Sequence, residues 1–169
     1  MSKRALKKYL TSLKKVALEE QLIDLYERFP EVKEYYDFVF NPKEDKLIQE
    51  AKTKISNEYF PLKRKKAKAR RSVAQKYIKH FIKLGVAPEL IADLMLYNIE
   101  IAQTYALENK VADTFYKSML NSFTEMTQFI STNALLPNFK DRIVTSYTHT
   151  QDQKWSYSEG FSRALDVLD

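Results

Sequence analysis

The chain has 169 residues and a formal net charge of +6 at neutral pH, with 44% hydrophobic and 13% aromatic residues. This length suits one domain with its own core, and the hydrophobic fraction excludes disorder over most of the chain. The absence of cysteine excludes disulfides and thiolate metal sites, and two glycines are too few for a glycine-rich nucleotide-binding loop. We therefore expect a protein of the reducing cytoplasm.

The sequence predicts helices over most of the first sixty residues. Hydrophobic residues recur at helical spacing in four segments, at residues 6–13, 18–29, 32–40 and 47–59. Ser2 is a plausible N-cap for the first helix, and Pro30 and Pro42 mark the starts of the third and fourth. Pro61 marks the end of the fourth helix.

Five more helices are expected after residue 71. Their apolar stripes fall at residues 73–84, 90–102, 115–130, 139–147 and 161–168. Gly85 fits a C-terminal cap, and Pro88 opens the next helix. Polar residues occupy only a small part of the circumference of that helix, so we expect it to be the central buried helix. The sequence thus predicts an all-α fold, a single compact domain of about seven to nine helices that form layered helical pairs.

A basic run separates these two groups of helices. Seven cations occur among residues 63–71 without an acid, and six more occur in the first fifteen residues. We expect an exposed connection at residues 61–71. Lys76, Lys79 and Lys83 follow at spacings of three and four, so they line one helix face and enlarge the basic surface.

The basic run favours a polyanionic partner, either a nucleic-acid backbone or an acidic protein surface. The candidate binding residues are Lys63, Arg64, Lys65, Lys66, Lys68, Arg70, Arg71, Lys76, Lys79 and Lys83. An alternative is a solvated loop, or one that pairs with acidic helices of the same chain such as residues 19–27. No zinc finger or RNA-recognition signature accompanies the run.

Catalytic patterns are weak in this sequence. Neither His80 nor His149 belongs to a pair spaced for a metal, and no G-x-S-x-G elbow is present. We therefore predict no catalytic residue, no metal and no cofactor, and favour a non-enzymatic interaction module. An enzyme or small-ligand binder with an inter-helical pocket near His80, Tyr97, Asn98 or His149 is the alternative.

Membrane insertion is not expected, because no stretch approaches the roughly 18 apolar residues of a spanning helix. The first helix combines lysines with an apolar stripe and could rest on an anionic membrane. Packing on the protein core explains this stripe more simply.

Three stretches carry a resemblance to known proteins. They are SKRALKKYL at residues 2–10, VKEYYDFVFNP at 32–42 and ARRSVAQKYIKHF at 69–81. They resemble an uncharacterised family of small helical bacterial proteins, a domain of unknown function. The resemblance implies a bacterial cytoplasmic protein and supplies no catalytic residues.

Overall fold

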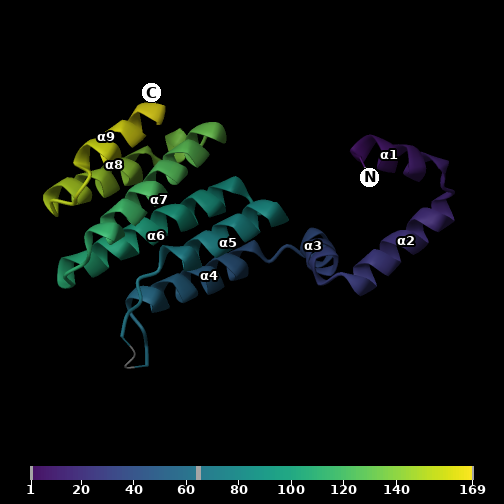
Figure 1. The fold of residues 1–169 in the computed structure, drawn as a ribbon, viewed down its shortest axis with the longest axis horizontal. Coiled ribbons are helices and arrows are strands. Elements are labelled where there is room, and N and C mark those ends of the chain that lie inside the picture. The colour runs from purple at the N-terminus through teal and green to yellow at the C-terminus, as the bar shows by residue number, and fades with distance from the viewer. Residues whose placement is uncertain (1, 64–65, 169) are drawn as a thin grey trace. The chain divides into compact units, whose positions relative to one another are not determined.

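The computed structural model describes residues 2–63 and 66–168, and within them it confirms the all-α fold with nine α-helices and one short 3₁₀ helix (Figure 1). Contacts divide the chain into two compact units, Met1–Lys43 and Glu44–Asp169. The division therefore falls at residue 43 and not at the basic run. The single domain stays a prediction.

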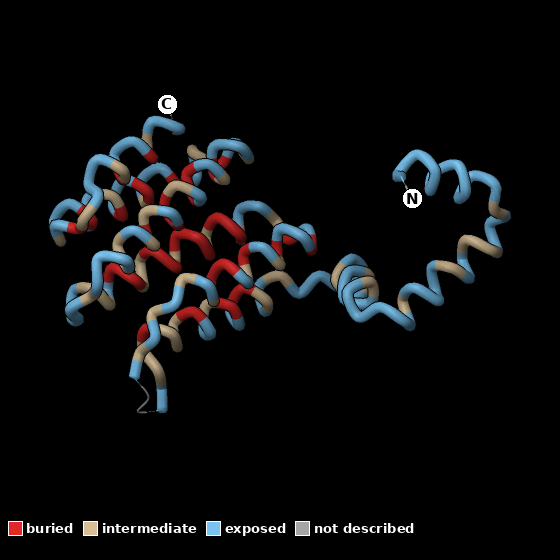
Figure 2. The backbone as a smooth tube through the Cα atoms, in the orientation of Figure 1, coloured by how far each residue is buried: buried red, intermediate tan, exposed pale blue. Residues whose placement is uncertain are grey.

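Unit 1 contains three helices, α1 (Lys3–Ser12), α2 (Lys15–Arg28) and α3 (Pro30–Phe40). Ser2 caps α1 as predicted, because its hydroxyl accepts a hydrogen bond of 3.2 Å from the Ala5 amide. Pro30 occupies the first position of α3, where its missing N–H costs no helical hydrogen bond. None of residues 2–43 is buried (Figure 2).

Unit 2 begins with α4 (Glu44–Tyr59) and α5 (Arg71–Leu84), which are joined by the basic connection. Its other helices are α6 (Pro88–Glu108), α7 (Asp113–Thr132), α8 (Leu136–Asp152), α9 (Ser158–Leu165) and the 3₁₀ helix η1 (Asp166–Leu168). Every buried residue of the described chain lies in this unit (Figure 2). The hydrophobic core of unit 2 is therefore built from residues 44–168 alone.

The central helix of unit 2 is α6, as its apolar sequence predicted. Leu94, Leu96 and Ile99 are fully buried on it, and the helix packs against α4, α5, α7 and α8. The helices of unit 2 pack mainly on helices one or two places away in the chain. This pattern agrees with the layering of helical pairs expected from the sequence.

Neither a membrane-spanning helix nor a metal-binding cluster occurs among residues 2–63 and 66–168. No helix there is long and apolar enough to cross a lipid bilayer. No group of three or more histidine, aspartate or glutamate side chains in this part of the chain is arranged to hold a metal ion.

Candidate polyanion-binding groove

The end of the basic connection is fastened to the end of α4. The amides of Lys68 and Ala69 donate hydrogen bonds of 3.0 and 2.9 Å to the Glu58 carbonyl. The Arg70 guanidinium also donates two hydrogen bonds, of 2.8 and 2.9 Å, to the Glu58 carboxylate. This pairing lowers the pKa of Glu58 and raises the pKa of Arg70. The part of the connection next to α5 therefore has a defined path.

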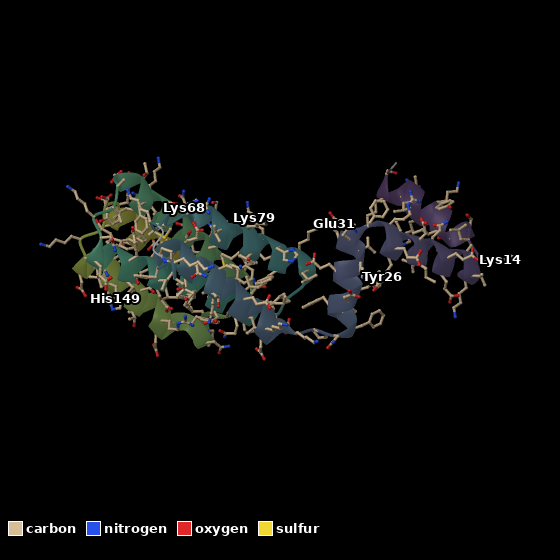
Figure 3. All side chains as sticks on the ribbon, turned by 90° about the horizontal axis from the view of Figure 1, so that it is seen from below. Lys14, Tyr26, Glu31, Lys68, Lys79 and His149 are labelled. Atoms are coloured by element: carbon tan, nitrogen blue, oxygen red, sulfur yellow. The ribbon has the colours of Figure 1, made fainter. Side chains whose placement is uncertain are left out.

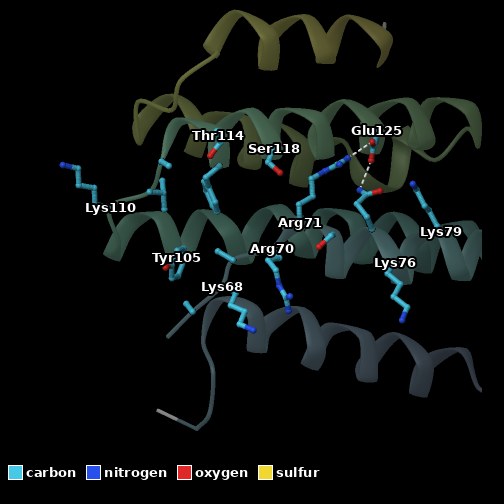
Figure 4. Close-up of a pocket in the computed structure, with 17 residues that line it drawn as sticks. Lys68, Arg70, Arg71, Lys76, Lys79, Tyr105, Lys110, Thr114, Ser118 and Glu125 are labelled. Atoms are coloured by element: carbon cyan, nitrogen blue, oxygen red, sulfur yellow. Dashed lines mark hydrogen bonds and ion pairs between the residues drawn. The ribbon is translucent and has the colours of Figure 1, made fainter. Parts of the chain in front are cut away.

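Arg71, the first residue of α5, joins this helix to α7. Its Nε donates a hydrogen bond of 2.8 Å to the Ser122 hydroxyl, and its guanidinium lies 2.5 Å from the Glu125 carboxylate. The Gln75 amide donates a further hydrogen bond of 2.8 Å to Glu125. Two side chains of α5 thus engage the one acidic group on this wall of the groove (Figure 4).

An open groove of about 900 Å³ lies between these elements. Its walls come from the connection at residues 67–70, from α5, from the C-terminal part of α6, and from residues 110–125. Lys68, Lys76 and Lys79 lie around it with Lys110, which is at the opposite end from Lys79 (Figure 4). The groove thus brings together lysines from three segments of unit 2.

These four lysines differ from the two arginines in their partners. Lys68, Lys76, Lys79 and Lys110 are exposed, and none forms an ion pair with a residue in the described ranges. Arg70 and Arg71, in contrast, are bound to Glu58 and Glu125. Figure 3 shows Lys68 and Lys79 along the same side of unit 2, with His149 apart from both. The lysine ammonium groups are therefore available to an external anion.

The structure brings together only part of the predicted binding set. Lys68, Arg70, Arg71, Lys76 and Lys79 line the groove. Among the remaining candidates, Lys63, Lys66 and Lys83 are exposed outside the groove lining, and Arg64 and Lys65 lie outside the described residues.

Other lining residues were not singled out from the sequence. Lys110, Thr114 and Ser118 also line the groove, from the segment before α7 and from α7 itself. They lie 26 residues or more beyond the end of α5 in the sequence, so the packing of α5 on α7 brings them near the basic run. No local sequence pattern marks them.

A second, smaller cavity of about 370 Å³ lies between α6 and α8 and is lined by His149. Gln103 also lines it and is 2% exposed, and its Nε2 donates a hydrogen bond of 2.6 Å to the Ser146 carbonyl. Its Oε1 has no hydrogen-bond partner within the described chain. Tyr97 does not line this cavity, and its ring instead faces the Lys52 ammonium at 5.2 Å.

The two remaining residues of the predicted inter-helical pocket also lie away from this cavity. Asn98 is buried on α6, and its amide has no hydrogen-bond partner in residues 2–63 and 66–168. His80 lies on α5 with its ring 5.8 Å from the ring of Phe81. The sequence-based pocket is thus represented only by His149.

Comparison with protein families gives a match over the whole chain. The chain belongs to the family of unknown function DUF6155, whose model matches residues 1–169. Membership confirms the predicted resemblance to a family of unknown function, and the all-helical structure agrees with it. Comparisons with curated proteins and with solved structures give no match.

Proposed function

We propose that this member of the family is a non-enzymatic interaction module, and that the groove of unit 2 binds the phosphate backbone of a nucleic acid. The observation that carries the proposal is the set of four lysines around one open groove, none of them paired with an acid of the described chain. The ammonium groups of these lysines can therefore interact with an anionic ligand.

The charge balance of the groove supports an anionic ligand. Six cationic side chains line it, together with a single carboxylate, that of Glu125. Arg71 and Gln75 already bind this carboxylate, so its repulsion of a phosphate is reduced. Each lysine that contacts a phosphate releases a condensed counterion, which makes binding favourable and strongly dependent on salt.

Neutral donors in the groove can add hydrogen bonds to the oxygens of a bound phosphate. Ser72, Thr114 and Ser118 lie among the lysines, and hydroxyl groups of this kind are frequent partners of backbone phosphate oxygens. The groove is also open rather than enclosed, as an extended strand requires.

The test uses a variant with Lys68→Gln, Lys76→Gln, Lys79→Gln and Lys110→Gln. A matched control neutralises four exposed lysines elsewhere in unit 2, Lys54, Lys117, Lys140 and Lys154, also with glutamine. Binding of both variants and of the unmodified chain to single-stranded RNA and duplex DNA is measured by fluorescence anisotropy at 50 mM salt. Circular dichroism verifies that both variants remain helical.

We expect the groove variant to bind nucleic acid at least about tenfold more weakly than the unmodified chain. The control variant should lose much less affinity. Equal loss in both variants would mean that only net charge matters, which contradicts a site in the groove. Binding to polyglutamate without binding to nucleic acid would overturn the proposal in favour of an acidic protein partner.

A small polar ligand in the cavity between α6 and α8 is a second candidate. The favouring observation is Gln103, which is nearly fully buried beside this cavity with an unpartnered carbonyl oxygen. Such a group fits an amine or amide donor. A thermal-shift screen of small amines and amides, repeated with Gln103→Leu, tests it; compounds that stabilise both chains equally would rule this cavity out.

The proposed setting is the cytoplasm of a bacterium. The resemblance of the sequence to small helical bacterial proteins supports this location. Localisation of a tagged full-length chain in bacterial cells, followed by fractionation, would test it; recovery in the membrane or secreted fraction would contradict it.

A further inference from the structure

Unit 1 carries many apolar side chains but buries none of them. Val16, Ile23 and Phe40 are 63%, 58% and 82% exposed. A segment of this length rarely holds helices together without a core, a disulfide or a partner. The apolar faces of α1, α2 and α3 therefore require a covering surface.

The charges of unit 1 are segregated by helix. Helix α1 contains four cations and no acid, whereas α2 contains four acids and two cations. Helix α3 adds three acids against one cation. Unit 1 thus presents a basic helix and an acidic helix pair, which are complementary to each other.

Among residues 2–43, the basic helix α1 forms no ion pair with α2 or α3, and the ion pairs of α2 join residues of α2 itself. Within unit 1, no ion pair with a described residue is formed by Lys3, Arg4, Lys7 or Lys8 of α1. The same holds for Glu20, Glu27 and Glu31 on α2 and α3. Helices α1 and α2 are joined instead by a neutral hydrogen bond of 2.8 Å from Gln21 to the Tyr9 hydroxyl.

We propose that unit 1 is the interface of a homodimer, in which α1 of one copy lies against α2 and α3 of the other. A two-fold interface uses each complementary pair of surfaces twice, so both basic helices and both acidic helix pairs find a partner. Leu6, Leu10, Leu22 and Leu25, each at least 36% exposed, supply apolar area for the centre of such an interface. This inference is independent of the groove in unit 2.

The test exchanges charges in the full chain. One variant has an acidic α1, with Lys3→Glu, Arg4→Glu, Lys7→Glu and Lys8→Glu. The other has a more basic α2 and α3, with Glu20→Lys, Glu27→Lys and Glu31→Lys. The control reverses Lys54, Lys117, Lys140 and Lys154 of unit 2 to glutamate. Sedimentation equilibrium measures the dimer dissociation constant of each chain and of an equimolar mixture of the two variants.

We expect the unmodified chain and the control to be dimers, and each charge variant alone to dissociate at least roughly a hundredfold more readily, because like charges face each other across the interface. The mixture should form a heterodimer, since acidic α1 then meets basic α2 and α3. This recovery separates interface repulsion from simple unfolding of a variant.

Three results would overturn the proposal. The first is an unmodified chain that stays monomeric at 100 μM, roughly the upper range for a weak specific dimer. The second is a dimer that persists in both charge variants, because its interface would then lie elsewhere. The third is a mixture that stays monomeric. Sedimentation of a monomeric chain with vesicles of anionic phospholipid would assign α1 to a lipid surface instead.

Discussion

At the scale of single residues, Arg142 of α8 forms ion pairs with two acidic residues of α6. Its guanidinium donates hydrogen bonds of 2.9 and 3.0 Å to Glu100 and of 2.7 Å to Asp93. Asp93 also forms an ion pair of 2.6 Å with Lys52 of α4. Burial acts to raise the pKa of Asp93, but Lys52 and Arg142 outweigh it and lower this pKa. Three helices thus share one partly buried network.

We expect Asp93→Asn to reduce the free energy of unfolding by about 1–3 kcal/mol, because Lys52 and Arg142 would each lose a charged partner. Urea unfolding at pH 7 measures the change. The exposed Asp152→Asn serves as the control and should change stability by less than about 0.5 kcal/mol. An Asp93 variant as stable as the unmodified chain would contradict a stabilising network.

Glu58 gives a prediction about pH. Because Arg70 lowers its pKa in the folded chain, its carboxylate favours folding above its ordinary pKa, and this contribution is lost as pH falls through the lowered value. Glu58→Gln should therefore be less stable than the unmodified chain at pH 7, and the difference in stability should be smaller at pH 3. Urea unfolding at both pH values measures it, and a difference that stays constant would refute the assignment.

At the scale of elements, the end of α5 depends on Gly85. This residue has a φ of +87°, in the left-handed region that favours glycine. The amides of Gly85 and Val86 donate hydrogen bonds of 3.0 and 3.1 Å to the Phe81 carbonyl, which closes the helix. An added Cβ would meet no atom within 4 Å, so only backbone strain opposes a substitution.

We expect Gly85→Ala to lower the free energy of unfolding by about 1 kcal/mol, the cost of placing an L-residue in this conformation. Gly85→Asn should cost less, because asparagine tolerates the left-handed region better. Thermal unfolding of both variants and of the unmodified chain measures the order of their stabilities. Equal stability of the alanine variant and the unmodified chain would show that the cap is unstrained.

The helix boundaries show what the sequence could predict. Four helix-terminal residues act through local backbone chemistry, so the sequence predicted their roles and the structure agrees. They are Ser2, Pro30, Gly85 and Pro88. Burial of α6 was readable from its continuous apolar character. These features depend on residues close together in the chain.

The groove shows what the sequence could not predict. The basic run indicated a cationic surface, but the partners of Arg70 and Arg71 are Glu58 and Glu125, and Glu125 lies more than fifty residues away. Which cations are engaged and which are available therefore depends on the packing of α5 and α7. Lys110 joins the groove for the same reason.

At the scale of the whole molecule, the core belongs to unit 2. Its buried residues extend from Ile48 to Ala164, and residues 2–43 contribute none. A chain lacking residues 1–43 should therefore remain helical and melt cooperatively, within a few degrees of the full chain. Circular dichroism on heating measures this. A broad, non-cooperative transition would mean that unit 2 needs unit 1 to fold, and that the two form one cooperative domain.

The central claim is that Lys68, Lys76, Lys79 and Lys110 contact phosphates in one groove. The most direct measurement is the salt dependence of affinity for single-stranded RNA, for the unmodified chain and for the four-lysine glutamine variant. If each lysine neutralises one phosphate, the slope of log affinity against log salt should become shallower by roughly 3 in the variant. An unchanged slope, with the variant folded, would contradict phosphate contacts in the groove.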